Sequence, residues 1–176
     1  MKTDARVRYT KMIIKDTFLK LLKKKSVDKI TVTELCKAAD INRATFYTHY
    51  EDCYDLLRSI EDEFINQFKQ TGKKEKLCDP KELITSIYDV LDDNRELCNV
   101  LIFESKHPTM INRLMDTARD YSKDKWNKTM PDLSDEEQEM LFNYLATGLS
   151  ALIYNNYKTQ DRNKTINLMV ELITKF

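Results

Sequence analysis

The sequence contains few residues that break helices and lacks the marks of several common protein classes. It has only two glycines and three prolines among 176 residues, which is sparse for an all-β or loop-rich fold. No apolar run approaches the roughly 20 residues that a membrane helix needs. The charged start, MKTDARVRYTKM, has no apolar core of a signal peptide. We therefore expect a mostly helical, cytoplasmic protein with no membrane partner.

Signs of catalytic or metal chemistry are also missing. The four cysteines, Cys36, Cys53, Cys78 and Cys98, are widely spaced, and neither histidine sits near a cysteine pair. The sequence therefore predicts no metal site and no cofactor. It has no nucleophile–base pair and no glycine-rich phosphate loop, so an enzyme is not expected. In a reducing cytosol the cysteines should be free thiols, and a redox-sensing role for one of them stays open.

Charge is unevenly distributed although it sums to zero. Residues 1–50 carry twelve Lys and Arg against five Asp and Glu, a net charge of +7, while residues 51–176 carry −7. A basic N-terminal part beside an acidic remainder is typical of a chain whose first part meets a polyanion. A solvated, lysine-rich helix face would give the same count, so charge alone does not decide.

Hydrophobic periodicity and capping residues predict an all-α fold of about nine helices with no convincing strand. Capping boxes at Thr31–Glu34 and Ser134–Glu137, and an N-cap at Asn42, mark three of the helix starts. The expected helices cover about residues 4–25, 33–39, 43–50, 51–70, 80 onward, 94 onward, 108–130, 135–157 and 162–175.

The stretch ADINRATFYTHYEDCYDLL, residues 39–57, is the most specific part of the sequence. Two short helices joined by a four-residue turn, after a longer helix, describe a helix-turn-helix whose second helix can lie in the major groove of DNA. Phe46 and Tyr50 are four residues apart and should face the core. The rest of this helix offers an arginine for guanine, small side chains for a thymine methyl, and rings and hydroxyls for phosphates. These predicted DNA contacts are Arg43, Ala44, Thr45, Tyr47, Thr48 and His49.

The run ITVTELCKAADINRATFYTHYEDCYDLL, residues 30–57, resembles the DNA-binding module of the TetR family (TetR/AcrR-like) of bacterial transcription regulators. The resemblance rests on the pattern T-[FL]-Y-x-H-[FY] after a capped short helix, and it extends back through the first helix. It implies backbone contacts by Thr31 and Thr33, and Lys37 joins the predicted DNA contacts. Asp40 stands where the family usually has glycine. Cys53 stands where lysine is frequent, which puts one phosphate contact in doubt.

The same resemblance implies two domains. Residues 1–50 would form a three-helix, helix-turn-helix DNA-binding domain, and residues 51–176 a helical ligand-binding and dimerisation domain of a compact subgroup, with helix four, about residues 51–70, connecting them. The last two helices would pair with those of a second copy. Gly148 would permit close approach there, or would sit in a crowded contact within the chain. The predicted interface residues are Gly148, Leu152, Ile166, Met169 and Ile173.

Aromatic residues of the C-terminal part either line an effector pocket between helices five to eight or fill the core. They are Tyr88, Phe103, Tyr121, Trp126, Phe142 and Tyr144. The pocket would take a small apolar or aromatic molecule. The expected function is a homodimeric regulator that binds a palindromic operator in double-stranded DNA, a repressor released by a small molecule. The alternatives are a constitutive DNA binder without effector and a helical adaptor whose helix-turn-helix docks on protein.

Overall fold

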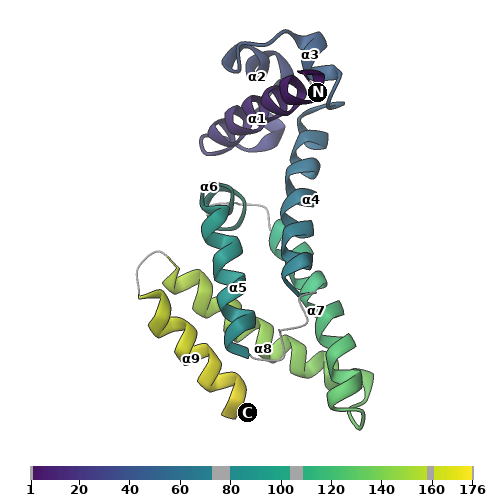
Figure 1. Cartoon of the computed structure of the whole chain (residues 1–176), viewed down its shortest axis with the longest axis vertical. Helices are drawn as coiled ribbons and strands as arrows, with labels where there is room; N and C mark the ends of the chain where they lie inside the picture. The colour runs from purple at the N-terminus through teal and green to yellow at the C-terminus, as the bar shows by residue number, and fades with distance from the viewer. Residues whose placement is uncertain (1, 73–79, 104–108, 158–160, 176) are drawn as a thin grey trace. The chain divides into compact units, whose positions relative to one another are not determined.

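The computed structural model describes residues 2–72, 80–103, 109–157 and 161–175, and all regular structure in these ranges is helical (Figure 1). The expected all-α class is confirmed. Cys78 lies outside the described residues. The α-helices described are α1 (Lys2–Leu22), α2 (Val32–Ala38), α3 (Arg43–Tyr47), α4 (Cys53–Gly72), α5 (Pro80–Asp93), α6 (Arg95–Cys98), α7 (Thr109–Thr129), α8 (Asp135–Asn156) and α9 (Arg162–Lys175).

Two short segments depart from the α-helical pattern. A 3-10 helix, η1 (Val27–Lys29), precedes α2, and a π-helix, η2 (Asn99–Phe103), continues directly from α6. The sequence predicts one helix from Asn94 onward, because the apolar spacing over a single turn does not separate π from α geometry. The helical character of this stretch is confirmed, whereas its change of type is visible only in the structure.

The predicted caps of α3 and α8 are present. The Asn42 Oδ1 atom accepts a hydrogen bond from the Thr45 amide at 2.7 Å. Ser134 and Glu137 exchange side-chain and backbone hydrogen bonds in a full capping box. These bonds satisfy amides that the first turn of a helix leaves without partners.

The predicted capping box of α2 is only half formed. The Thr31 Oγ1 atom accepts from the Glu34 amide at 3.2 Å, as expected for an N-cap. The Glu34 carboxylate pairs with the Lys25 ammonium at the end of the α1 region. A cation is a stronger partner for a carboxylate than a neutral amide is, which explains the departure.

The turn between α2 and α3 places Asp40 in the left-handed backbone region, with φ 52°. The Ile41 amide donates to the Cys36 carbonyl at 3.0 Å and ends α2. Aspartate enters this region at a modest cost because its short polar side chain can bond locally. The conformation therefore needs no glycine at this position.

Contacts between Cα atoms divide the chain into two compact units. Unit 1 contains Met1–Phe64 and Arg95–Pro108, and unit 2 contains Ile65–Asn94 and Thr109–Phe176. This boundary lies within α4, whereas the sequence predicts a division after residue 50. The first half of α4 belongs to unit 1, where its Leu56 and Ile60 side chains are buried.

The core of unit 1 holds the short helices in place. Phe18 of α1, Leu35 of α2 and Phe46 of α3 are fully buried. Helices α1 and α2 pack together, as do α2 and α3. Burying one such side chain contributes about 1.5–3 kcal/mol. Because α3 has five residues and could not persist alone, this core is what holds it as a helix.

The described cysteines, Cys36, Cys53 and Cys98, are free and buried. Burial raises the pKa of the Cys53 thiol to about 11, and burial also raises the pKa of Cys36. The thiolate is the reactive form of cysteine, so both groups are protonated and unreactive near neutral pH. Their environments give no support to a redox-sensing role for Cys36 or Cys53.

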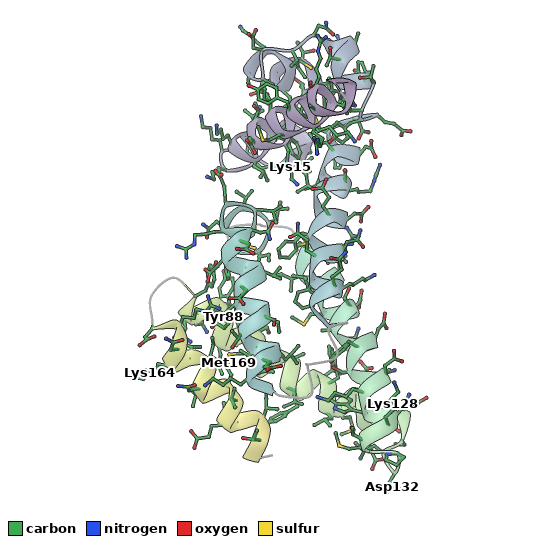
Figure 2. The ribbon with its side chains drawn as sticks, viewed as in Figure 1. Lys15, Tyr88, Lys128, Asp132, Lys164 and Met169 are labelled. Carbon is green, nitrogen blue, oxygen red and sulfur yellow. The ribbon has the colours of Figure 1, made fainter. Side chains whose placement is uncertain are left out.

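Unit 2 is built around the contact of α5 with α9. Ile84 and Tyr88 of α5 and Ile166 and Met169 of α9 form a buried cluster, partly covered by apolar residues of α8 (Figure 2). Arg162, the first residue of α9, adds ion pairs to α5 carboxylates. Its Nη1 atom donates to Asp92 at 2.8 Å, and its Nη2 atom binds Asp89. The start of α9 is thereby attached to α5 by both apolar and charged contacts.

Candidate nucleic-acid interface

The aromatic rings of residues 46–50 divide between the inside and the outside of unit 1. Phe46 is fully buried and Tyr50 is nearly so, whereas 49% of Tyr47 is exposed. The Phe46 ring meets Tyr47 edge-on, with centroids 5.6 Å apart, and lies 5.7 Å from Tyr50. One side of α3 is thus anchored in the core, and the other side carries Tyr47 outward.

Arg43 opens α3 on its exposed side. Its Nη2 atom donates to the Tyr47 hydroxyl at 3.2 Å, and its guanidinium lies 5.7 Å from the centre of the Tyr47 ring. This contact between residues i and i+4 holds the long arginine side chain along the helix. The guanidinium stays in solvent, where it can exchange the tyrosine for a planar acceptor such as the O6 and N7 edge of guanine.

The two threonines of this segment donate their hydroxyl hydrogens locally. Thr45 Oγ1 donates to Asn42 Oδ1 at 3.0 Å, and Thr48 Oγ1 donates to the Thr45 carbonyl at 2.7 Å. Each hydroxyl keeps lone pairs for acceptance, and the methyl groups remain apolar contacts. A threonine methyl in this position is suited to the methyl group of thymine.

The nine predicted DNA contacts come from α2, α3 and the residues at their ends, and none of them is buried. Thr45 and His49 are half-buried, and seven are exposed: Thr31, Thr33, Lys37, Arg43, Ala44, Tyr47 and Thr48. A recognition surface needs side chains that are free to reach a groove. The burial pattern meets this requirement, and direct contact of these residues with DNA stays a prediction.

The six predicted pocket residues differ in burial and in the packing around them. Tyr88 is in the α5–α9 cluster, Trp126 and Phe142 are buried on α7 and α8, and 68% of Tyr144 is exposed. Tyr121 is half-buried on α7, and Phe103 belongs to unit 1. The exposed Tyr144 ring is not part of an enclosed lining. Sequence spacing missed this because aromatic content alone does not say which side of a helix faces inward.

A cleft of about 390 Å³ lies between α5 and α9 in unit 2. None of the six aromatic residues lines it. Its walls are mainly polar and include two cations: they are formed by Lys81, Thr85, Arg162, Asn163, Ile166 and Asn167. This composition differs from the apolar, aromatic pocket that the sequence predicts.

The predicted dimer residues are also divided. Ile166 and Met169 are 3% and 1% exposed in the core of their own chain, so their side chains are not available to a second copy. Leu152 and Ile173 are half-buried against that core. Gly148 is exposed, and a Cβ atom added there would meet nothing within 4 Å. The crowded contact within the chain, one of the two expectations for Gly148, is therefore wrong.

The structure exposes apolar residues on α8 and α9 that sequence reasoning missed. Met140 and Tyr144 lie four residues apart on α8, and Leu168 and Leu172 lie four apart on α9; 67%, 68%, 46% and 39% of these side chains are exposed. The signal was available as a second apolar pair on α9, on a different side of the helix from the stripe of Ile166, Met169 and Ile173. The sequence pattern predicts the buried stripe as the interface because both stripes are apolar.

The described residues lack two further features. No group of three or more His, Cys, Asp or Glu side chains is placed to hold a metal ion among them. Within the same ranges, no helix combines the length and the apolar character needed to span a membrane.

Residues 79–176, more than half of the chain, match the family model TetR_C_8, described as a transcriptional regulator C-terminal region. Among solved structures, the chain is similar to a TetR transcriptional regulator from Streptococcus agalactiae 2603V, with 20% identity, 98% of each chain covered and a TM-score of 0.71. It is similar to a transcriptional regulator (TerR/AcrR family) from Aquifex aeolicus VF5, with 18% identity, 94% of this chain and 98% of that chain covered, and a TM-score of 0.66.

A third similar structure is the transcriptional regulator FadR from Bacillus subtilis in complex with stearoyl-CoA. Its identity is 16%, the match covers 92% of this chain and 96% of that chain, and the TM-score is 0.65. No curated protein matches the sequence. At these identities the solved structures show a shared fold.

Proposed function

Because this chain belongs to the TetR/AcrR family of transcriptional regulators, we propose that it binds a palindromic DNA operator as a homodimer. Residues 1–50 are the DNA-binding module, and residues 51–176 serve dimerisation and regulation. The observation that carries this proposal is the two-sided α3, whose Phe46 side is buried and whose Arg43 and Tyr47 side is exposed.

Base reading is assigned to Arg43, and positioning to its neighbours. The Arg43 guanidinium has the fork of donors that matches guanine in the major groove. Tyr47, Thr48 and His49 are suited to phosphates, which fix the register of a protein on the duplex. The net charge of +7 on residues 1–50 adds attraction that does not depend on sequence.

Arg43→Ala is expected to weaken operator binding by about 1–3 kcal/mol and to relax the base preference at one operator position. Removing the guanidinium leaves the guanine edge without its bidentate partner. Selection of bound sequences from random duplex DNA, followed by footprinting, gives the wild-type operator and its half-site spacing, and the same selection with the variant reports the lost preference.

Arg58→Ala is the matched control, because Arg58 is an exposed arginine of α4 paired with Asp55 within the same unit. It removes the same charge without touching the proposed base contact, and base preference should not change. If Arg43→Ala weakens binding equally on every sequence, Arg43 contacts only phosphate and the base assignment is wrong.

Dimerisation is assigned to the exposed apolar surface of α8 and α9, which we define as Met140, Tyr144, Gly148, Leu168 and Leu172. Large apolar side chains that are more than a third exposed, on two neighbouring helices, are typical of a protein–protein interface. Gly148 follows Tyr144 by four residues and leaves room for a second helix to approach. A dimer is needed for two recognition helices to reach half-sites about one helical turn apart.

Gly148→Ala is expected to have opposite effects on the chain and on the dimer. Within the chain, alanine should favour the helical state by about 0.5–1 kcal/mol, because glycine is the poorer helix former and the added Cβ meets nothing. At a close helix contact between copies, the same methyl group should weaken association. Sedimentation equilibrium measures the dimer constant, and Asn143→Ala, exposed on the same helix, is the control. If Gly148→Ala leaves the association unchanged or tighter, Gly148 is not part of the interface.

Regulation is proposed to be repression that a small molecule relieves through unit 2. FadR from Bacillus subtilis was solved with stearoyl-CoA, and a shared fold makes ligand binding in this part of the chain reasonable to test. Thermal-shift screening followed by a DNA-release assay with each stabilising compound tests it directly. If no compound both stabilises the protein and changes operator affinity, the chain is a constitutive DNA binder, and reporter expression then separates repression from activation.

An adaptor whose helix-turn-helix docks on protein makes a different prediction about salt. Binding to duplex DNA through several phosphates should weaken steeply as salt rises, because each neutralised phosphate releases counterions. If the wild-type protein is folded by circular dichroism but does not bind duplex DNA even at low salt, the adaptor is favoured.

A further inference from the structure

Residues 5–12, in the first half of α1, lie outside the core of unit 1. None of these residues is buried, and from residue 5 onward Ile14 is the first that is fully buried. This segment carries Arg6, Arg8 and Lys11 and contains no acidic residue. Helix turns without packing are marginal in water, so the core of unit 1 gives these residues little support. Three cations on such a segment are an interaction surface for an anionic partner.

The basic segment lies beside the proposed recognition surface. The Lys11 ammonium is 6.0 Å from the centre of the Tyr50 ring, and the Tyr50 ring meets His49 with centroids 6.3 Å apart. Figure 1 shows the N-terminal end of α1 close to α3 within unit 1. An anion that extends beyond the residues of α3 would therefore meet Lys11 first and then the preceding turns of α1.

Three lysines farther along the α1 region make ion pairs within unit 1. Lys15 pairs with Glu63, and Lys23 pairs with Glu96 at 2.6 Å; Lys25 pairs with Glu34. These lysines neutralise carboxylates of unit 1 and so support the fold. Residues 6–12 also carry two exposed apolar side chains: the ring of Tyr9 is 61% exposed and the thioether of Met12 is 50% exposed. The cations and these apolar groups together form a surface suited to contact with both phosphate and sugar.

We propose that residues 5–12 of α1 are a second DNA contact, which binds the phosphates flanking each half-site outside the bases read by α3. This inference rests on the proposed DNA-binding function and adds positioning residues to it. Arg6 and Lys11 neutralise flanking phosphates, and Tyr9 lies against the sugars between them. The partner is the nucleic-acid backbone because phosphate charge and sugar surface alternate along it, matching this mixture of cations and apolar groups.

The test compares the salt dependence of operator binding for four proteins: wild type, Arg6→Ala, Lys11→Ala and the double variant. Each substitution removes one cation from each subunit of the dimer, so the slope of log K against log salt should fall in magnitude by about 1.8 for a single variant and by about 3.6 for the double variant. Lys24→Ala, which removes an exposed lysine at the far end of the α1 region, is the matched control and should leave the slope unchanged. Circular dichroism and unchanged base selection show that α3 is intact.

A second duplex localises the contact. Methylphosphonate groups, which are uncharged, replace the phosphates that flank the half-sites. On this duplex, the salt slope of wild type should fall to the value that the double variant shows on unmodified DNA. The slope of the double variant itself should not change. Suppose that wild type binds the operator but Arg6→Ala and Lys11→Ala change the salt slope no more than Lys24→Ala does. That result would overturn the inference and leave the function of α3 intact. Failure of wild type to bind any selected duplex would instead overturn the proposed function itself.

Discussion

Glutamate at both Leu168 and Leu172 is expected to convert the protein from a dimer to folded monomers that bind the operator poorly. The two side chains are 46% and 39% exposed on α9, away from the core stripe of the same helix. In a dimer they would be covered by the second copy, and an unpaired carboxylate buried there is strongly unfavourable. We expect a loss of at least about 2 kcal/mol of association energy, roughly 30-fold in the dimer constant.

Light scattering at micromolar concentration should give about twice the chain mass of 20.9 kDa for wild type and the chain mass itself for the double variant. Asn167→Glu is the control, since Asn167 is an exposed polar neighbour on the same helix. Operator affinity should fall with the dimer, because a monomer reaches only one half-site. If the double variant remains dimeric, the interface lies elsewhere. If wild type is a monomer, the proposal of a palindromic operator is wrong.

Met169→Glu is a useful contrast to these two substitutions. Met169 is 1% exposed between α5 and α9, so a carboxylate there would be buried inside the chain. The sequence pattern predicts monomers for this variant, and the structure instead predicts loss of folded unit 2. Circular dichroism separates the two outcomes.

Phe46→Ala is expected to destabilise unit 1 by about 3–5 kcal/mol. The ring is fully buried and contacts Tyr47 and Tyr50, so truncation removes apolar burial and leaves a cavity under a five-residue helix. Since most small domains are stable by only about 5–15 kcal/mol, this loss would remove a large fraction of the stability of unit 1.

Tyr47→Ala is the matched control, because it removes a neighbouring ring that is 49% exposed. It should change the stability of unit 1 by less than about 1 kcal/mol, as is usual for surface positions, while weakening DNA binding. Urea denaturation of the full chain, followed by circular dichroism, measures both variants. Similar losses of stability for Phe46→Ala and Tyr47→Ala would contradict the assignment of one ring to the core and the other to the surface.

Most helix starts could be predicted from the sequence because they depend on local chemistry. Pro80 and the Ser134–Glu137 box mark the starts of α5 and α8, and Asn42 marks α3. Each signal involves residues within one turn, so no distant contact is needed to interpret it. The end of α3 was less predictable. The helix stops at Tyr47, where the pattern predicts residue 50.

The candidate DNA surface was also predictable in its main division. A period of 3.6 residues places Phe46 and Tyr50 on one side of the helix predicted over residues 43–50 and Arg43 and Tyr47 on another, and the burial of these residues follows that division. The exposed first turns of α1 were not predictable, because their helical pattern continues without a break into the packed part. Only the burial pattern, in which none of residues 5–12 is buried, distinguishes them.

The sequence by itself determined the all-α class, the family, the caps that begin the helices and the basic character of the first 50 residues. Tertiary structure decided which apolar stripe of α9 is internal: Ile166 and Met169 face α5, and Leu168 and Leu172 are left outside. It also decided that Glu34 pairs with Lys25 and that Tyr144 is exposed. Local signals act within a turn or two of helix, whereas the inside of a helix is defined by elements far away in the chain, and hydrophobicity is the same for both stripes.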